Sequence, residues 1–143
     1  MKKSIGLLLL LTLPFLSPAQ NLTADKGAAM LKTFYTAYIS LSSGENADLE
    51  ASEAKLLALR RKYCTPACLK QFKILVEETD GDPIIKAQDS YKELIKTLVI
   101  KKDLKKPNRY AVSYIDLQGT HEKTTIYVTL IEQSGALKIA HLE

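Results

Sequence analysis

The chain has 143 residues, of which 46% are hydrophobic and 25% charged, and its formal net charge is +4 at pH 7. This length suits one domain with a single hydrophobic core. Basic residues cluster only at 60–62 and 101–106, which excludes the concentrated basic face of a nucleic-acid-binding protein and leaves an anionic partner or surface as an alternative.

Residues 1–19 have the layout of a secretory signal peptide. Lys2 and Lys3 give a positive start, residues 5–13 form a mostly apolar run, and residues 17–19 (Ser-Pro-Ala) supply small side chains before a cleavage point. The apolar run is about half as long as the roughly 20 residues that a membrane-spanning helix needs. We therefore predict cleavage, with an uncleaved anchor as the alternative.

Cleavage before Gln20 predicts a mature domain of residues 20–143. The first cysteine is Cys64, so no lipid-bearing cysteine stands at the cut. Loss of the two N-terminal lysines leaves the mature chain close to neutral. We expect a periplasmic or secreted protein without stable membrane insertion.

Apolar residues at steps of three and four predict three helices in the N-terminal half. The first covers residues 23–41 and the second residues 46–62. The third opens at Thr65 and Pro66, because Thr is a good N-cap and Pro fits the first helical position. It ends in residues 79–83, which contain Gly and Pro.

The apolar period then changes to two, which predicts strands. The expected strands are residues 94–101, 110–115, 125–130 and 137–142. Short turns join them, so we expect a four-stranded antiparallel meander. One face is predicted to bury Tyr110, Val112, Tyr114, Ile126, Val128, Leu130, Leu137 and Ile139 against the helices. Three helices followed by four strands is the order of an α+β fold.

Short segments of the chain resemble a bacterial family of secreted and lipoprotein-type proteins of unknown function, common in Bacteroidetes. The segments are Phe34-Tyr35 with Tyr38-Ile39, Tyr63 to Pro66, Asp82 to Asp89, Tyr110 to Val112 and Gly135 to Ile139. The resemblance implies a cystatin-like, nuclear-transport-factor-two-like α+β fold, in which helices pack in the hollow of a curved sheet. It implies no established activity.

Cys64 and Cys68 are the two cysteines of the chain. Export to an oxidising compartment favours a disulfide between them, which would stabilise the fold by about 2 kcal/mol because the loop is short. Two free thiols, a redox pair, or a metal site completed by His121 or His141 are the alternatives.

The candidate binding residues are three tyrosines and one acid. Tyrosine combines an apolar ring with a polar tip, which suits the edge of a pocket. We predict that Tyr35, Tyr38, Tyr114 and Asp89 line the hollow between helices and sheet. The expected function is a non-enzymatic module that binds a small molecule or a peptide there, with no cofactor and no metal.

Two other functions remain open. An envelope protein could bind the outward sheet face, where Thr125, Tyr127 and Thr129 alternate, which would make the chain an interaction or inhibitor module. An enzyme could use Asp89 as its acid or base, which requires a buried carboxyl with a perturbed pKa. The sequence contains no nucleophile-elbow serine, phosphate-binding glycine loop or two-histidine metalloprotease motif.

Overall fold

The structure is a computed structural model that describes residues 25–44, 48–88 and 90–143. The predicted signal peptide and Asp89 lie outside the described residues. The helices are α1 (Lys26–Ser42), α2 (Leu49–Tyr63), α3 (Pro66–Thr79) and α4 (Leu94–Thr97). The strands are β1 (Val99–Lys102), β2 (Arg109–Ile115), β3 (Lys123–Gln133) and β4 (Ala136–Leu142). The fold is α+β, as predicted.

Helix α1 begins at a cap that also ties it to the sheet. One carboxylate oxygen of Asp25 accepts hydrogen bonds from the N–H groups of Gly27 and Ala28, at 2.9 and 3.1 Å. The hydroxyl of Tyr110, on β2, donates to the same oxygen at 2.7 Å. A residue that satisfies free N–H groups at a helix start therefore also fixes the distance between α1 and β2.

The corner between α2 and α3 is tied to the last strand. The hydroxyl oxygen of Thr65 accepts from the N–H of Cys68 at 3.1 Å, and Pro66 occupies the first turn of α3. This confirms the predicted start of the third helix. The N–H of Thr65 also donates to the carbonyl of Ile139 at 2.9 Å, which anchors the corner against β4.

The four strands pair in the order β1-β2-β3-β4, and every pair is antiparallel. This confirms the predicted meander. The register shifts between Thr129 and Leu130, where β3 pairs with β4. The predicted core face is buried except at Leu137, which is half-buried. Leu137 pairs with Glu132 beside the exposed β3–β4 turn, where no helix covers it fully.

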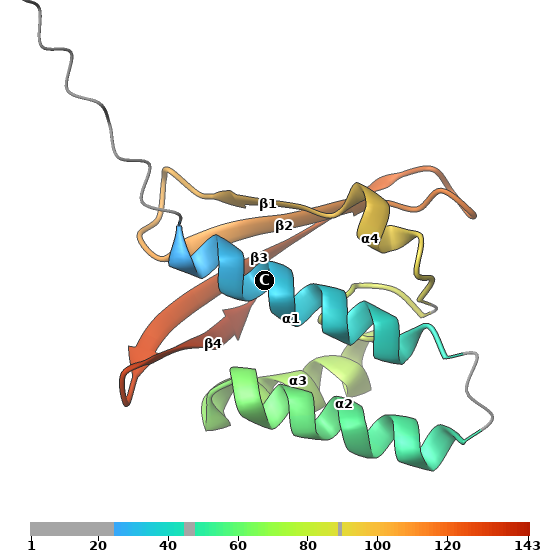
Figure 1. Cartoon of the computed structure of the whole chain (residues 1–143), viewed down its shortest axis with the longest axis horizontal. Coiled ribbons are helices and arrows are strands. Elements are labelled where there is room, and N and C mark those ends of the chain that lie inside the picture. Colours follow the sequence, from blue (N-terminus) through green and yellow to red (C-terminus); the bar gives the residue numbers. More distant parts are fainter. Residues whose placement is uncertain (1–24, 45–47, 89) are drawn as a thin grey trace, which may run out of the picture.

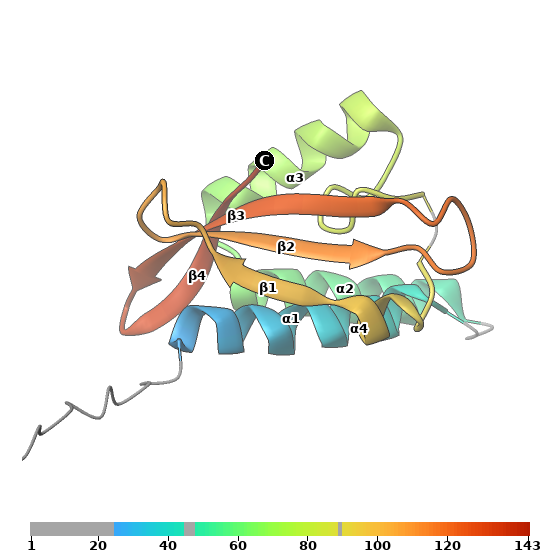
Figure 2. The same ribbon diagram turned by 90° about the horizontal axis from the view of Figure 1, so that it is seen from above.

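The helices lie mainly against one face and one edge of the sheet (Figures 1 and 2). Helix α1 runs along the sheet and contacts β1, α2 packs against α1, and α3 contacts β4. The largest fully buried side chains are Leu31, Phe34, Tyr35, Tyr38, Ile39, Cys68, Ile84, Ile85, Val112, Ile126, Val128 and Ile139. Among the described residues, no helix is both long and apolar enough to cross a membrane.

The first predicted strand is wrong over residues 94–97, which form helix α4. In a strand, Leu94, Lys96 and Leu98 would share a face. Leu94 and Leu98 are buried but Lys96 is exposed, which fits a helical turn with apolar residues four apart. The N–H of Lys96 donates to the carbonyl of Glu93 and closes this turn. The described residues thus form four helices and four strands.

Candidate functional site

The three tyrosines predicted to line the hollow belong to the core. Tyr35 and Tyr38 are 0% exposed and Tyr114 is 2% exposed. The ring of Phe34 packs edge-on against Tyr35, with centroids 5.3 Å apart. Side chains therefore fill the space between α1 and the sheet at these positions. The hydroxyls of Tyr38 and Tyr114 instead reach a loop that follows α3.

This loop, residues 80–88, has a fixed backbone path. The N–H of Asp82 donates to the carbonyl of Ala87 at 3.1 Å and closes the loop on itself. Between them, Ile84 and Ile85 are buried in the core, at 1% and 2% exposure. Lys86 has a φ of 45°, a left-handed conformation that non-glycine residues seldom adopt. We call this segment the pocket loop.

Two tyrosines hold the pocket loop by hydrogen bonds. The Tyr38 hydroxyl donates to Asp82 Oδ2 at 2.6 Å, and the Tyr114 hydroxyl donates to the carbonyl of Ile85. Asp82 Oδ1 also accepts from the N–H of Ile84 at 2.8 Å. The predicted ligand-lining role of these tyrosines remains a prediction, but the structure gives both a positioning role.

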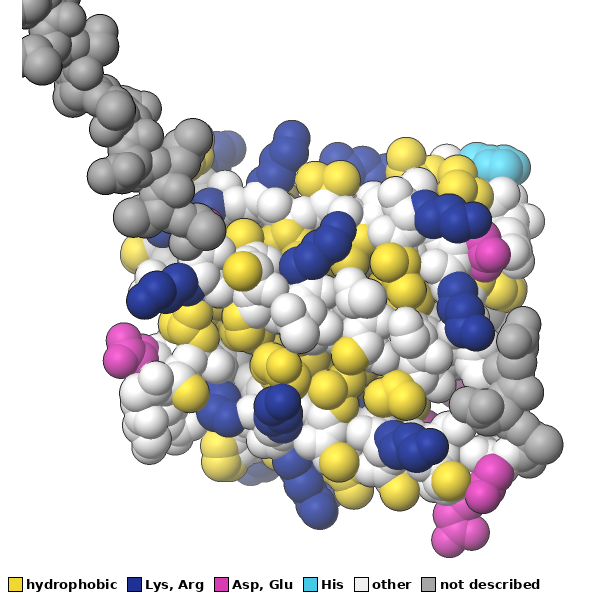
Figure 3. All heavy atoms as spheres, in the orientation of Figure 1, with side chains coloured by type: hydrophobic (Ala, Val, Ile, Leu, Met, Phe, Trp, Pro, Cys, Tyr) yellow, Lys and Arg dark blue, Asp and Glu magenta, His cyan; other side chains and the backbone are white. Residues whose placement is uncertain are grey.

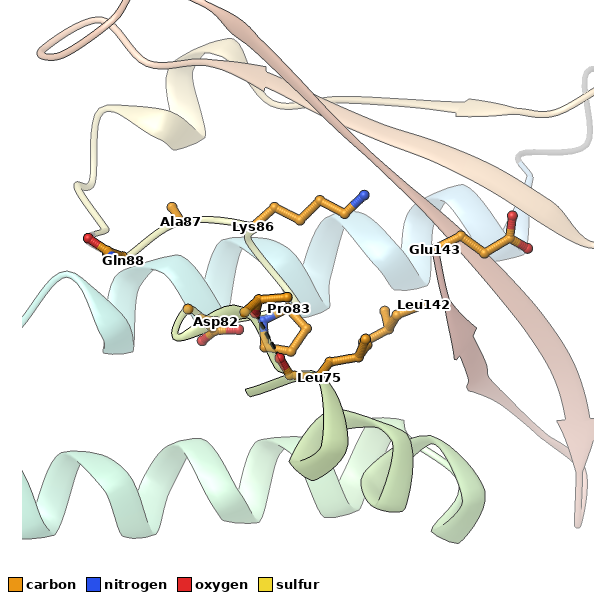
Figure 4. A pocket seen from close by; sticks show the side chains of 10 residues that line it. Leu75, Asp82, Pro83, Lys86, Ala87, Gln88, Leu142 and Glu143 are labelled. Atoms are coloured by element: carbon orange, nitrogen blue, oxygen red, sulfur yellow. Dashed lines mark hydrogen bonds between the residues drawn. The ribbon is translucent and has the colours of Figure 1, made fainter. Parts of the chain in front are cut away.

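A pocket of about 470 Å³ opens beside this loop, which we call the loop pocket. Leu75 and Thr79 come from α3, Leu142 and Glu143 from the end of β4, and the pocket loop forms the remaining wall. The wall residues from the loop are Gly81, Asp82, Pro83, Lys86, Ala87 and Gln88. Figure 4 shows Leu75, Pro83 and Leu142 converging, with Lys86 and Gln88 farther out along the loop. The pocket is mainly apolar, with polar groups on the loop.

Asp82 links the loop pocket to a buried chain of polar groups. Nη1 of Arg60, on α2, donates to the Tyr38 hydroxyl at 2.9 Å, and that hydroxyl donates to Asp82. Burial raises the pKa of Asp82, and the hydrogen bonds from Tyr38 and from the N–H of Ile84 offset part of this effect. Burial and the adjacent Asp82 carboxylate raise the pKa of Tyr38 well above its usual range. The Tyr38 hydroxyl is therefore a donor, and not a phenolate, at neutral pH.

Asp82 and Gln88 also line a smaller pocket of about 310 Å³. Its other walls include Leu41 and Ser42 of α1 and Leu56 of α2. The two pockets thus flank Asp82. Asp89, which we predicted as a binding residue or a catalytic acid, directly follows Gln88 but lies outside the described residues.

Cys64 and Cys68 lie side by side as free, buried thiols. A hydrogen bond between the two side chains raises the pKa of Cys64 and lowers that of Cys68. The structure shows no disulfide between them, and the disulfide stays a prediction. Among the described residues, no three His, Cys, Asp or Glu side chains gather where a metal ion would bind.

Sequence reasoning missed Arg60, Leu75 and Leu142 as parts of the site. Arg60 lies in the basic run of residues 60–62, yet it is only 8% exposed. Its guanidinium lies 4.4 Å from the centroid of the Phe72 ring. The sequence does contain a signal for this contact, because Leu69 and Phe72 are three residues apart on α3. Residues at this spacing share one face of a helix, and here that face meets the α2–α3 corner.

No protein-family model matches the chain, and no curated protein matches it. A solved structure of a protein of unknown function from Bacteroides thetaiotaomicron VPI-5482 is similar, with a TM-score of 0.73 and 27% sequence identity. The match covers 82% of this chain and 88% of the other. This likeness supports the uncharacterised Bacteroidetes-type family that the sequence motifs indicated.

Proposed function

We propose that the protein is an exported, non-enzymatic binding module whose ligand is a small, mainly apolar molecule held in the loop pocket. The observation that carries this proposal is the pocket itself. Its volume of about 470 Å³ falls within the roughly 300–1,000 Å³ of ordinary ligand sites, which are also mainly apolar with a few placed polar groups.

The pinned loop supports the same proposal. Tyr38 and Tyr114 hold the pocket loop from the core, while Ile84 and Ile85 bury its middle. A wall that is already ordered loses little conformational entropy when a ligand binds. We propose further that the fold is of the cystatin-like, nuclear-transport-factor-two-like kind, and that the ligand site lies at the end of its sheet.

Export rests on the layout of residues 1–19. Expression in a bacterial host, followed by separation of the envelope fraction from the cytoplasmic fraction, tests export directly. The expected product in that fraction has the mass of residues 20–143 and begins at Gln20. A protein of full-length mass that stays in the cytoplasmic fraction would contradict export while leaving the binding proposal open.

A screen of thermal stability against apolar small molecules tests binding. Ala87 is half-buried in the pocket wall and packs against the edge of the core, so Ala87→Phe should fill part of the pocket, and circular dichroism of this variant establishes that it is folded. Ala54→Phe is the matched control, because Ala54 is exposed on α2. We expect a compound that raises the melting temperature of the wild type and of Ala54→Phe, but not of Ala87→Phe. Equal responses in all three proteins would place the ligand elsewhere.

The open sheet face supports a second candidate function, binding of an envelope protein. Val99, Ile115 and Tyr127 on this face are 44%, 38% and 38% exposed. Exposed apolar side chains on neighbouring strands are typical of interaction surfaces. Cross-linking in envelope extract should then depend on Tyr127. Unchanged cross-linking by Tyr127→Lys would remove this candidate.

A further inference from the structure

A further hollow lies between α2 and α3, at the corner where they meet. Its volume is about 530 Å³. Leu57 of α2 and Leu69 and Phe72 of α3 give it an apolar floor. Leu57 is 38% exposed, an open position for a leucine. We call this hollow the corner groove; it shares none of its lining residues with the loop pocket.

Cations surround this floor. Arg60 and Arg61 line the corner groove from α2, and Lys70 and Lys73 line it from α3. Arg60 is held in place, because it donates to the Tyr38 hydroxyl and stacks on the Phe72 ring. The other three are exposed. Within the described part of the chain, no carboxylate forms an ion pair with Arg61, Lys70 or Lys73.

The charge of the whole corner is one-sided. Residues 54–76 contain six Lys and Arg residues and no Asp or Glu. On the described surface in Figure 3, basic side chains are scattered over the face that carries α1 and α2, between hydrophobic and other side chains, while acidic ones stand near its margins. A positive field of this kind attracts anions and raises their association rate. Glu53, 3.5 Å from Arg60, is the nearest acid along α2 and is itself largely exposed.

We propose that the corner groove binds a single-chain anionic amphiphile of the long-chain fatty-acid type. The acyl chain would lie on the floor made by Leu57, Leu69 and Phe72. The carboxylate would meet the exposed cations Arg61, Lys70 and Lys73. Charge complementarity selects an anion, and the apolar floor selects one with a tail.

The shape of the groove favours this occupant over a bilayer. Leu69 and Phe72 are half-buried in this hollow, whereas Arg61, Lys70 and Lys73 are exposed around it. A flat lipid surface would meet the rim and leave the floor uncovered. A free amphiphile can place its chain inside the groove and its carboxylate at the rim.

Fluorescence titration with dansyl-labelled undecanoic acid, below its critical micelle concentration, tests the proposal. Unlabelled saturated fatty acids of increasing length then compete for the probe. Each added methylene group should strengthen competition, by up to about fourfold. The alcohol of the same length should compete at least about tenfold more weakly than the acid, because it lacks the charge that meets the rim.

Charge reversal locates the site. The triple variant Arg61→Glu, Lys70→Glu and Lys73→Glu should weaken probe binding at least about tenfold. Lys101→Glu, Lys102→Glu and Lys105→Glu form the matched control, with the same change in net charge at the end of β1 and in the turn after it, and should bind as the wild type does. Circular dichroism of both variants establishes that they are folded.

Three results would overturn the proposal. One is equal weakening by both triple variants, which would show that only net charge matters. Another is competition that does not depend on chain length or on the carboxylate. The third is binding to anionic phospholipid vesicles without binding of the monomeric acid, which would assign the corner to a membrane surface. None of these outcomes bears on the loop pocket, because the two sites share no lining residue.

Discussion

Three polar side chains from different parts of the chain connect α2 and α1 to the pocket loop. Arg60 donates to Tyr38, and Tyr38 donates to Asp82. Such a chain in a low-dielectric interior is stable only when each member is satisfied, since an unpaired buried polar group is costly. Tyr35 is the contrast, because its buried hydroxyl has no hydrogen-bond partner among the described residues.

Two tyrosine-to-phenylalanine variants compare a buried hydroxyl that has hydrogen-bond partners with one that has none among the described residues. Tyr38→Phe should lower the free energy of unfolding by about 1–3 kcal/mol, because it leaves Asp82 and Arg60 without their shared partner. Tyr35→Phe should be neutral or stabilising, because it removes a hydroxyl that lacks a partner. Urea denaturation of both variants measures the difference. Equal losses would contradict the polar chain.

The pKa of Asp82 predicts a pH effect of defined sign. Burial raises this pKa above the ordinary value of 3.8, so the folded protein takes up the proton at higher pH than the unfolded chain does. The protonated Asp82 carboxyl therefore contributes stability that is fully present at a pH below the ordinary pKa. This contribution is lost as the pH rises through the raised pKa of the folded protein.

The variant Asp82→Asn should lack this titration and keep a carbonyl acceptor for Tyr38. As the pH rises from below 3.8 towards neutrality, the wild type should therefore lose stability relative to the variant. Free energies of unfolding across this range test the claim, since the other titrating groups cancel in the difference. A constant difference, or one of opposite slope, would show that Asp82 is not the buried acid described here.

At the scale of elements, local signals predicted most of the fold. Thr65 and Pro66 mark the start of α3 because capping is decided within one turn. Alternation and short turns predicted β2, β3 and β4 in their observed order. Helix α4 was missed because four residues fit either period, and only its packing against the core decides between them.

The contacts that hold the site have no such local signal. Tyr38 and Asp82 are 44 residues apart, and Arg60 and Tyr38 are 22 apart. Leu75 and Leu142 meet only because α3 packs against β4. The family segment from Asp82 to Asp89 overlaps the pocket loop, and the pocket wall that the structure describes ends at Gln88.

Gly27 tests the junction between α1 and β2. Alanine is the better helix former by about 1 kcal/mol, so propensity alone predicts that Gly27→Ala stabilises the protein. A Cβ atom there would instead collide with the Tyr110 ring and hydroxyl, which the bond to Asp25 holds in place. We expect a net loss of stability, measured as a lower melting temperature. A rise would mean that Tyr110 can move away from the helix.

At the scale of the whole molecule, α3 contributes to two mainly apolar hollows, the loop pocket near its C-terminal end and the corner groove, with its added cations, along its first half. The cysteine pair lies at the corner where α3 begins. Thiols stay reduced in the cytoplasm and form disulfides in oxidising compartments. The redox state of Cys64 and Cys68 therefore reports on the compartment in which the whole domain works.

Export predicts that protein isolated from the envelope fraction contains the Cys64–Cys68 disulfide. Denaturation without reductant, followed by a thiol assay, should then find no free thiol. The same protein from the cytoplasm of a reducing strain is the control and should show two. Two free thiols in the envelope sample would contradict the predicted disulfide.

The central claim is that the loop pocket takes a small apolar ligand, and methyl NMR with leucine-labelled protein tests it most directly. On titration with a library of small, mainly apolar fragments, we predict saturable shifts of the Leu75 and Leu142 methyl groups that Ala87→Phe abolishes. Saturable shifts that appear only at Leu57 and Leu69, or at no leucine, would contradict the claim.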